Sequence, residues 1–158
     1  MIDDLHALLK SALSQHFPQL YLRHRMVSAA AYNYLYAAGR CYDSEPGKIQ
    51  SVSKKRDDLG TGNEFFGIVI DTFNDKENAL GFFTNAEGLR LDLTVFNDAQ
   101  GDYPINLSWN TFWDVAAVCN DQGWFAEMRI PFSSLRFQDK AWKVVMGLTT
   151  WRWIPRKN

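Results

Sequence analysis

The chain has 158 residues and is balanced in charge, with 17 Lys and Arg against 18 Asp and Glu, which gives a formal net charge of -1. Binding to nucleic acid is therefore not expected, because affinity for a phosphate backbone comes from clustered cationic side chains. Hydrophobic residues make up 46% and charged residues 22% of the chain, which indicates a folded globular domain and excludes a fully disordered chain.

The first segment is predicted to be an amphipathic helix. Apolar residues recur at helical spacing over residues 2–17, and Asp3 and Asp4 lie in the first turn, where the helix dipole favours anions. The N-terminus lacks the basic start and apolar run of a secretory signal, so any export signal is expected upstream. No stretch holds the ~18 consecutive apolar residues that cross a bilayer, and we expect no membrane contact by this chain itself. We divide the chain into a helical segment, 1–19, and a β-rich domain, 20–158.

After the helical segment, short strand candidates alternate with turns. The run Tyr32–Tyr42 is predicted as a hairpin whose second strand is largely buried, and the polar segment 48–63 is predicted to lie on the surface. Hairpin turns, a loop at 97–106 and a short helical turn near Ser133 separate the remaining strands. These strands are predicted at 65–73, 79–84, 89–96, 113–119, 123–130 and 142–153. Such spacing predicts an all-β fold, an antiparallel β-sandwich with a short N-terminal helix.

Sequence motifs of the common enzyme classes are missing. All three histidines precede the strand-rich body, and there is no Gly-x-Ser-x-Gly elbow or catalytic cysteine motif. The glycines at 60–62 lack the spacing and the lysine of a phosphate loop. We therefore assign no catalytic residue and expect no organic cofactor. Cys41 and Cys119 fit no metal-binding spacing and lie in strand-like stretches, so two buried free thiols are expected rather than a disulfide.

Acidic residues leave two weaker alternatives open. A glycoside hydrolase needs two carboxyl groups roughly 5 to 9 Å apart. Asp71, Asp92 and Glu127 are candidates, although ordinary structural roles are favoured for them. Calcium is the second alternative, because the run 71–77 is rich in oxygen ligands. This run lacks the EF-hand spacing, and a plain hairpin turn is the favoured interpretation.

Four motifs follow one another through the β-rich domain. They are LYAAGRCYDSEPGKI at 35–49, IVIDTFND at 68–75, GWFAEMRIPFSSLRF at 123–137 and RWIPRKN at 152–158. In this order they closely resemble the carbohydrate-binding module family 9-like domain, in the branch that forms the N-terminal part of larger bacterial cell-envelope proteins. The resemblance covers residues 34–158, whereas the helical segment and residues 20–31 match the family poorly.

The resemblance implies a jelly-roll-like β-sandwich that acts as a noncatalytic carbohydrate-binding domain, linked to polysaccharide binding or degradation. The implied partners are a saccharide or polysaccharide and a C-terminal region of the same polypeptide, and the implied location is the periplasm or cell envelope of a bacterium. Two alternatives stay open. The domain is either an interaction or plug-like domain of an outer-membrane protein that keeps the fold without binding sugar, or part of a glycoside hydrolase.

The resemblance also implies that aromatic side chains stack on a sugar while polar side chains bond its hydroxyls. Trp124 alternates with apolar residues along its strand and is predicted to fill the core instead. The predicted platform residues, which lie near a loop or share a strand face with Thr149, are Trp109, Trp113, Trp151 and Trp153.

Polar residues in the predicted strands form a second candidate group. If their strands are neighbours in one sheet, these side chains gather on the face opposite the core. They would serve there as a hydroxyl-binding groove or as a structural ion-pair network. The group consists of Asp71, Asn85, Glu127, Arg129 and Arg152.

Overall fold

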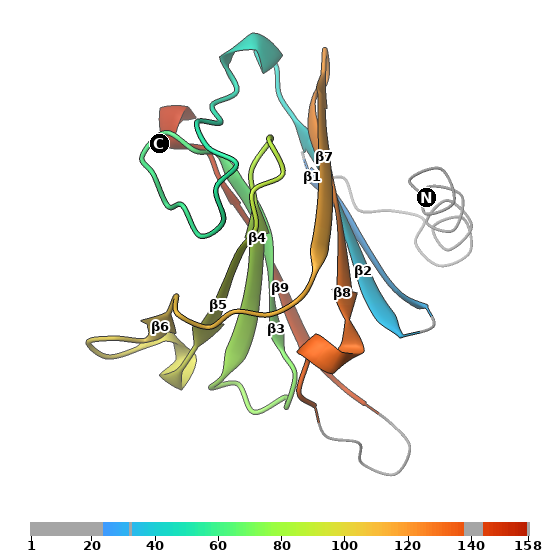
Figure 1. Cartoon of the computed structure of the whole chain (residues 1–158), viewed down its shortest axis with the longest axis vertical. Helices are drawn as coiled ribbons and strands as arrows, with labels where there is room; N and C mark the ends of the chain where they lie inside the picture. Colours follow the sequence, from blue (N-terminus) through green and yellow to red (C-terminus); the bar gives the residue numbers. More distant parts are fainter. Residues whose placement is uncertain (1–23, 32, 138–143, 158) are drawn as a thin grey trace.

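The computed structural model describes residues 24–31, 33–137 and 144–157, which form a sandwich of two antiparallel sheets (Figure 1). Sheet A has the strand order β1-β2-β8-β7, and sheet B has the order β6-β5-β4-β3-β9. The strands are β1 His24–Ala31, β2 Tyr34–Tyr42, β3 Phe65–Asp71, β4 Ala79–Thr84, β5 Leu91–Val95, β6 Ile105–Asn106, β7 Asp114–Asn120, β8 Gly123–Pro131 and β9 Gly147–Trp153. The predicted antiparallel sandwich is confirmed, and the helix predicted at 2–17 lies outside the described residues.

Most of the strand predictions agree with the structure. The strand predicted at 79–84 is β4 residue for residue, and β3, β5, β7, β8 and β9 overlap the other predicted strands. β1 and β6 were not predicted. β1 mixes His, Arg and Ser with apolar residues, and β6 has only two residues, so neither carries a clear alternating pattern.

The hairpin predicted within Tyr32–Tyr42 is wrong. β2 runs unbroken over Tyr34–Tyr42 and pairs from Tyr34 to Cys41 with β1, which is its hairpin partner. Gly39 is not a turn residue. A Cβ atom at this position would lie 2.5 Å from the Phe66 ring of the opposite sheet, so the glycine allows close packing between the two sheets.

The core lies between the two sheets and is rich in aromatic residues. Trp124 on β8 is fully buried, so the prediction that it fills the core is confirmed. Phe82 on β4 meets Trp109 and Trp113 edge to face, with ring centroids 5.9 and 5.5 Å apart. Such T-shaped pairs add stability beyond the area that they bury. Other core residues are Ala37, Cys41, Phe66, Ile68, Ile70, Ala86, Ala126, Met128, Ile130 and Leu135.

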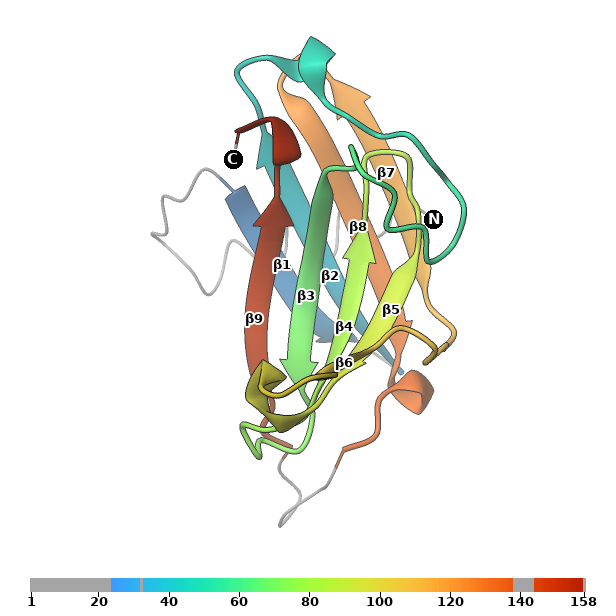
Figure 2. The ribbon, with the colours of Figure 1, turned by 90° about the vertical axis from the view of Figure 1, so that its left-hand side faces the viewer.

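Residues 50–63, which we call the 50–63 loop, pack against the outer side of sheet B (Figure 2). The Asn85 side chain, just after β4, donates hydrogen bonds to the Ser53 carbonyl at 2.7 Å and to the Asn63 side chain at 3.1 Å. The Asp57 amide donates to the Arg90 carbonyl at 3.0 Å. The loop therefore covers one end of β4 and β5 and leaves the outer side of β9 and β3 uncovered, as Figure 2 shows.

Asp92 on β5 ties three segments together from inside the sandwich. Its buried carboxylate accepts hydrogen bonds from Arg56 at 2.5 Å, from the Thr111 amide at 2.7 Å and from the Trp113 indole at 3.3 Å. A buried carboxylate is costly unless it is paired in this way. Asp92 therefore fixes both the 50–63 loop and the segment before β7.

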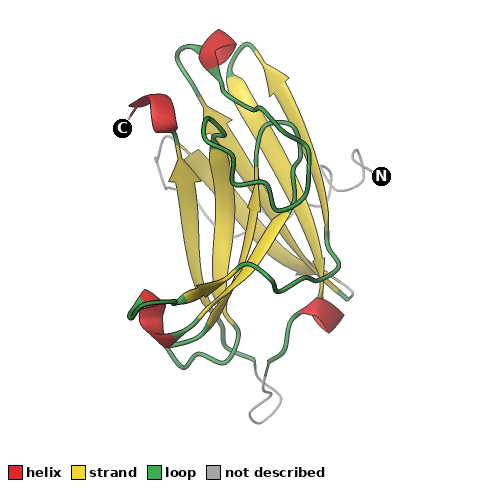
Figure 3. Cartoon of the chain, turned by 60° about the vertical axis from the view of Figure 1, so that its left-hand side comes forward, coloured by secondary structure: helices red, strands yellow, loops and turns green. Residues whose placement is uncertain are grey.

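Short 3-10 helices lie at the ends of the sandwich (Figure 3). The helical turn predicted near Ser133 is the 3-10 helix Phe132–Ser134. It has no side-chain cap, and the Ser134 hydroxyl donates instead to the Phe112 carbonyl at 2.7 Å. No helix among the described residues is long and apolar enough to cross a membrane.

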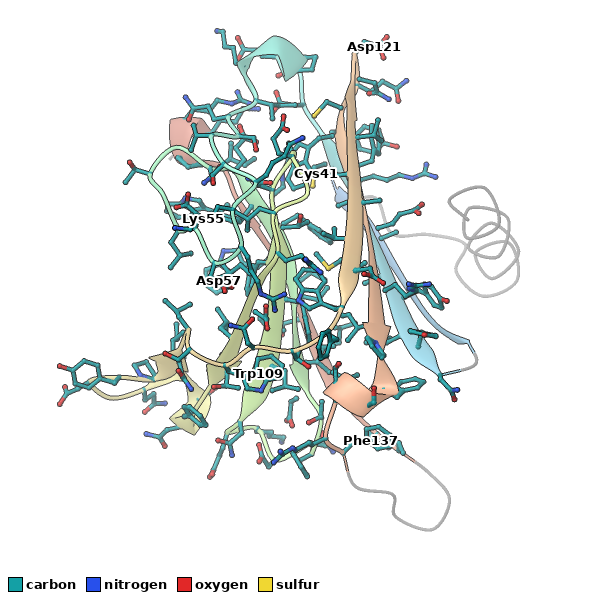
Figure 4. All side chains as sticks on the ribbon, viewed as in Figure 1. Cys41, Lys55, Asp57, Trp109, Asp121 and Phe137 are labelled. Atoms are coloured by element: carbon teal, nitrogen blue, oxygen red, sulfur yellow. The ribbon has the colours of Figure 1, made fainter. Side chains whose placement is uncertain are left out.

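Both cysteines are free thiols, as predicted. Cys41 is buried between the sheets (Figure 4), and burial raises the pKa of its thiol to about 12. Cys119 is exposed, which corrects the prediction that it is buried. It lies close to the end of β7, at the edge of sheet A, where sheet B covers it only in part.

Candidate functional site

The four tryptophans predicted as platform residues fall into two groups. Trp113 is 2% exposed and Trp109 is partly buried against the core, so Trp113 presents no indole face to a ligand. Trp151 and Trp153 on β9 are 55% and 46% exposed. The prediction for Trp113 is therefore wrong, because Phe82 and the buried Asp92 carboxylate hold its ring between the sheets.

Strand geometry places the two exposed indoles on the outer face of sheet B. Residues two apart on a strand point to the same side, about 6.6 Å apart along it. Trp153 pairs with Phe65, Trp151 pairs with Gly67, and the exposed Thr149 follows on the same face. β9 pairs only with β3 among the described strands, so the indoles stand at an edge of sheet B.

The surface beside Trp151 is flattened by two glycines. A Cβ atom on Gly67 would lie 2.6 Å from Cε1 of Phe83, and a Cβ atom on Gly81 would lie 2.8 Å from Cε2 of the same ring. Opposite edges of the Phe83 ring therefore approach the two glycines, so the ring lies across β3 and β4. Trp151 and Phe83 are separated only by the side-chain-free position of Gly67.

The outer face of sheet B is nearly free of charge. The outward positions of β9, β3 and β4 are residues 147, 149, 151 and 153, residues 65, 67, 69 and 71, and residues 79, 81 and 83. Asp71 is their only ionisable residue, and it lies at the end of β3. Two projecting segments flank this face in Figure 1, the 50–63 loop at one end and the β5–β6 connection at the other. Figure 4 shows Lys55 and Asp57 on the first of these.

The Asp71 carboxylate serves the turn that follows β3. It accepts hydrogen bonds from the amides of Phe73 at 3.2 Å, Asp75 at 3.2 Å and Lys76 at 2.8 Å. Asp75 in turn accepts from the amides of Glu77 and Asn78, both at 2.8 Å. The Asp71 and Asp75 carboxylates, which belong to the run 71–77, are thus engaged by the turn itself. Among the described residues, no group of three or more His, Cys, Asp or Glu side chains is arranged to hold a metal ion.

The structure does not bring the predicted polar group together. β8 belongs to sheet A, so Glu127 and Arg129 point outward on the opposite side of the molecule from Asp71. Arg152 points inward and donates to the Tyr42 carbonyl at 3.0 Å. Asn85 is buried under the 50–63 loop. The condition for one polar face, that these strands are neighbours in one sheet, is not met, because β8 belongs to sheet A whereas β3 and β9 belong to sheet B.

On the outer face of sheet A, polar and aromatic side chains are interleaved. Arg129 bonds to Asp114 on the neighbouring strand at 2.5 Å, and its guanidinium lies 5.1 Å from the centroid of the Tyr34 ring. Tyr34 and Tyr36 have ring centroids 6.1 Å apart. The hydrogen bond that Arg129 donates to the Asp114 carboxylate raises the pKa of Arg129 above its ordinary value. Arg129 and Asp114 therefore form an exposed ion pair on this face.

A buried charge cluster, which the sequence prediction missed, joins the two sheets near the C-terminus. Asp43, just after β2, bonds to Arg156 and lies 3.2 Å from Lys157. Arg156 also donates to the fully buried Glu64 at 2.8 Å. Burial alone would raise the pKa of Asp43, but the Glu45 amide, Lys157 and Arg156 hold it below its ordinary value. The basic residues of the RWIPRKN motif were a signal that could have indicated this cluster.

Comparison of the chain with protein-family models, with curated proteins and with solved structures found no match. The functional interpretation therefore depends on the site itself.

Proposed function

We propose that this chain is a noncatalytic carbohydrate-binding domain of the family 9-like type, which binds a saccharide on the outer face of sheet B. The observation that carries this proposal is the pair of exposed indoles on one face of β9. Trp151 and Trp153 are 55% and 46% exposed, although large aromatic side chains are usually covered.

Stacking and hydrogen bonding give this face two complementary ways of holding a sugar. The C–H side of a pyranose ring is apolar and packs against an indole. Sugar hydroxyls need polar partners at the margin of the apolar surface, and the exposed Thr149 hydroxyl lies on the same face of β9. The polar residues of the 50–63 loop flank this surface and supply further donors and acceptors.

The positions of the three candidate carboxylates for glycoside hydrolysis support a noncatalytic role. Asp92 points between the sheets, Asp71 closes a turn on the outer side of sheet B, and Glu127 lies on the outer side of sheet A. Hydrolysis needs two carboxyl groups on either side of one glycosidic bond. These three side chains lie in separate parts of the sandwich and form no such pair.

Our proposal includes the cellular context that the family resemblance implies. The domain would serve a larger protein of a bacterial cell envelope, next to a C-terminal region of the same polypeptide. Its task there would be to hold a polysaccharide close to that protein.

Isothermal titration calorimetry with glucose, cellobiose and xylo-oligosaccharides tests sugar binding. We expect heat of binding with at least one of these ligands and its loss in Trp151→Ala and Trp153→Ala. Phe112→Ala is the matched control, because Phe112 is 88% exposed but lies in the segment before β7, away from the outer face of sheet B. Absence of heat with every sugar would favour the interaction or plug-like role, and equal loss in Phe112→Ala would remove the assignment to β9.

A further inference from the structure

We infer that the ligand is a neutral glycan of at least two sugar units, and that Phe83 is a third stacking residue beside Trp151 and Trp153. This inference rests on the proposed function and narrows it to a class of ligand. It is carried by the flat Phe83 ring beside the exposed indoles.

The extent of the aromatic surface sets the minimum size of the ligand. Trp153 lies about 6.6 Å from Trp151 along β9, since same-face residues are two apart on the strand. Phe83 lies on β4, two strands from β9, and adjacent strands are about 4.8 Å apart. One pyranose ring cannot cover all three positions at once. Several linked units can, because successive rings then rest on different aromatic groups.

Phe83 can contribute to stacking because Gly67 and Gly81 allow its ring to pack flat against the backbone of β3 and β4. Gly67, between Trp151 and Phe83, contributes no side chain that would separate the two rings. Phe83 is partly exposed at an outward position of β4. A ligand seated on Trp151 therefore meets Phe83 on the β3 side.

The absence of charge on this face points to a neutral glycan. Among the described residues, the outward positions of β9, β3 and β4 hold one ionisable side chain, Asp71, whose carboxylate accepts three turn amides. A uronic acid polymer stacked on these strands would bring carboxylates to outward positions that carry no cation, since Lys54 and Lys55 lie on the flanking 50–63 loop, and desolvating carboxylates without a partner is unfavourable. Neutral hydroxyl-bearing sugars meet no such cost.

The accessible surface on β9, β3 and part of β4 forms a narrow strip, and this shape favours a glycan over a protein partner. Leu91 and Leu93 on β5 are 3% and 8% exposed, so the accessible apolar surface ends at β4. Stable protein interfaces cover about 800 Å² on each partner. A strip confined to β9, β3 and part of β4, with a projecting segment at each end, suits a slender chain better than a second folded surface.

Calorimetry over a ligand series tests this inference. With glucose, cellobiose, cellotetraose and a trigalacturonate as probes, we expect cellotetraose to bind at least tenfold more tightly than glucose and trigalacturonate to bind no better than glucose. Phe83→Leu should lower the affinity for cellotetraose by a larger factor than the affinity for glucose. Phe112→Leu is the matched control and should leave the whole series unchanged. Thermal melts confirm that each variant is folded.

The possible outcomes separate this inference from the proposed function. Equal affinity for glucose and cellotetraose, tighter binding of trigalacturonate, or an unchanged series in Phe83→Leu would overturn the inference and leave sugar binding intact. Absence of heat with every probe would overturn both. Sedimentation velocity adds a further arm, since a dimer that Trp151→Ala converts to a monomer would identify the strip as an interface between two copies.

Discussion

Sheets A and B arrange charge in opposite ways. Sheet A buries an apolar face and turns charged side chains outward, as Arg129 and Asp114 show. Sheet B turns Asp92 and Arg152 inward, where they bond to other segments, and exposes Trp151 and Trp153 on its outer face. The same alternation of side chains thus produces a charged outer surface on one sheet and an aromatic outer surface on the other.

This difference separates structural charges from a surface for ligands. Inside the sandwich, a buried charge needs partners. The Asp43 carboxylate and the Asp92 carboxylate each have at least three hydrogen-bond or ion-pair partners. Outside sheet B, an uncharged surface keeps indole faces available for stacking. The comparison predicts that removing a charge between the two sheets mainly lowers the free energy of unfolding. Adding a charge to the outer face of sheet B should mainly lower the affinity for a ligand.

The largest effect on stability is expected from Arg156→Met. This change leaves the buried carboxylates of Asp43 and Glu64 without their main cation, and breaking a buried pair typically costs about 3–5 kcal/mol. Arg129→Met, the matched control on the outer face of sheet A, should cost less than about 1 kcal/mol. Urea unfolding followed by tryptophan fluorescence measures both. Equal losses in the two variants would contradict the contrast between the sheets.

A smaller loss of stability is expected from Gly67→Ala on the outer face of sheet B. The new methyl group meets the Phe83 ring, and overpacking of this kind costs about 1–3 kcal/mol. Displacement of the ring should also weaken binding of cellotetraose more than binding of glucose. Gly47→Ala is the control, because no atom lies within 4 Å of its added Cβ. Unchanged stability in Gly67→Ala would show that the Phe83 ring moves freely and is not held in one position on the sheet.

The fold could be predicted from the sequence because alternation and turn residues are local signals. β8 shows the alternation, because Trp124 and every second residue after it are buried. β4 was predicted from the turn residues on either side of it. The hairpin predicted within Tyr32–Tyr42 shows the limit of such local signals, because the role of Gly39 depends on Phe66, which lies 27 residues later. Close packing between sheets leaves no local mark in the sequence.

The site could be predicted only in part. The shared face of Trp151 and Trp153 follows from their spacing on one strand, and the structure places both on the surface. The burial of Trp113 depends on Asp92, a residue of another strand, and the separation of Glu127 from Asp71 depends on which sheet β8 joins. Both are properties of strand pairing, which one sequence does not reveal without homologues.

A more gradual effect is expected from acid. The pKa of Asp43 is lowered in the folded protein, so its ion pairs contribute stability that is complete above the unfolded pKa of about 3.9 and is lost as the pH falls through the folded pKa. The difference in unfolding free energy between the wild type and Asp43→Asn should therefore narrow as the pH falls below ~4. Asp114→Asn should show a smaller difference throughout, since its ion pair is exposed. A gap for Asp43→Asn that does not change with pH would contradict an ionised Asp43.

The smallest effect on stability is expected from a new charge on the outer face of sheet B, whose strand positions are almost free of charge. Thr149→Glu places a carboxylate beside Trp151 on an exposed position, and surface substitutions usually change stability by less than about 0.5 kcal/mol. A glycan that stacks on the indoles must desolvate this carboxylate, so affinity for cellotetraose should fall by about tenfold, which equals ~1.4 kcal/mol. Thr149→Ser keeps the hydroxyl and should bind like the wild type. If Thr149→Glu binds cellotetraose unchanged, the ligand does not contact this part of β9, and the uncharged surface needs another explanation.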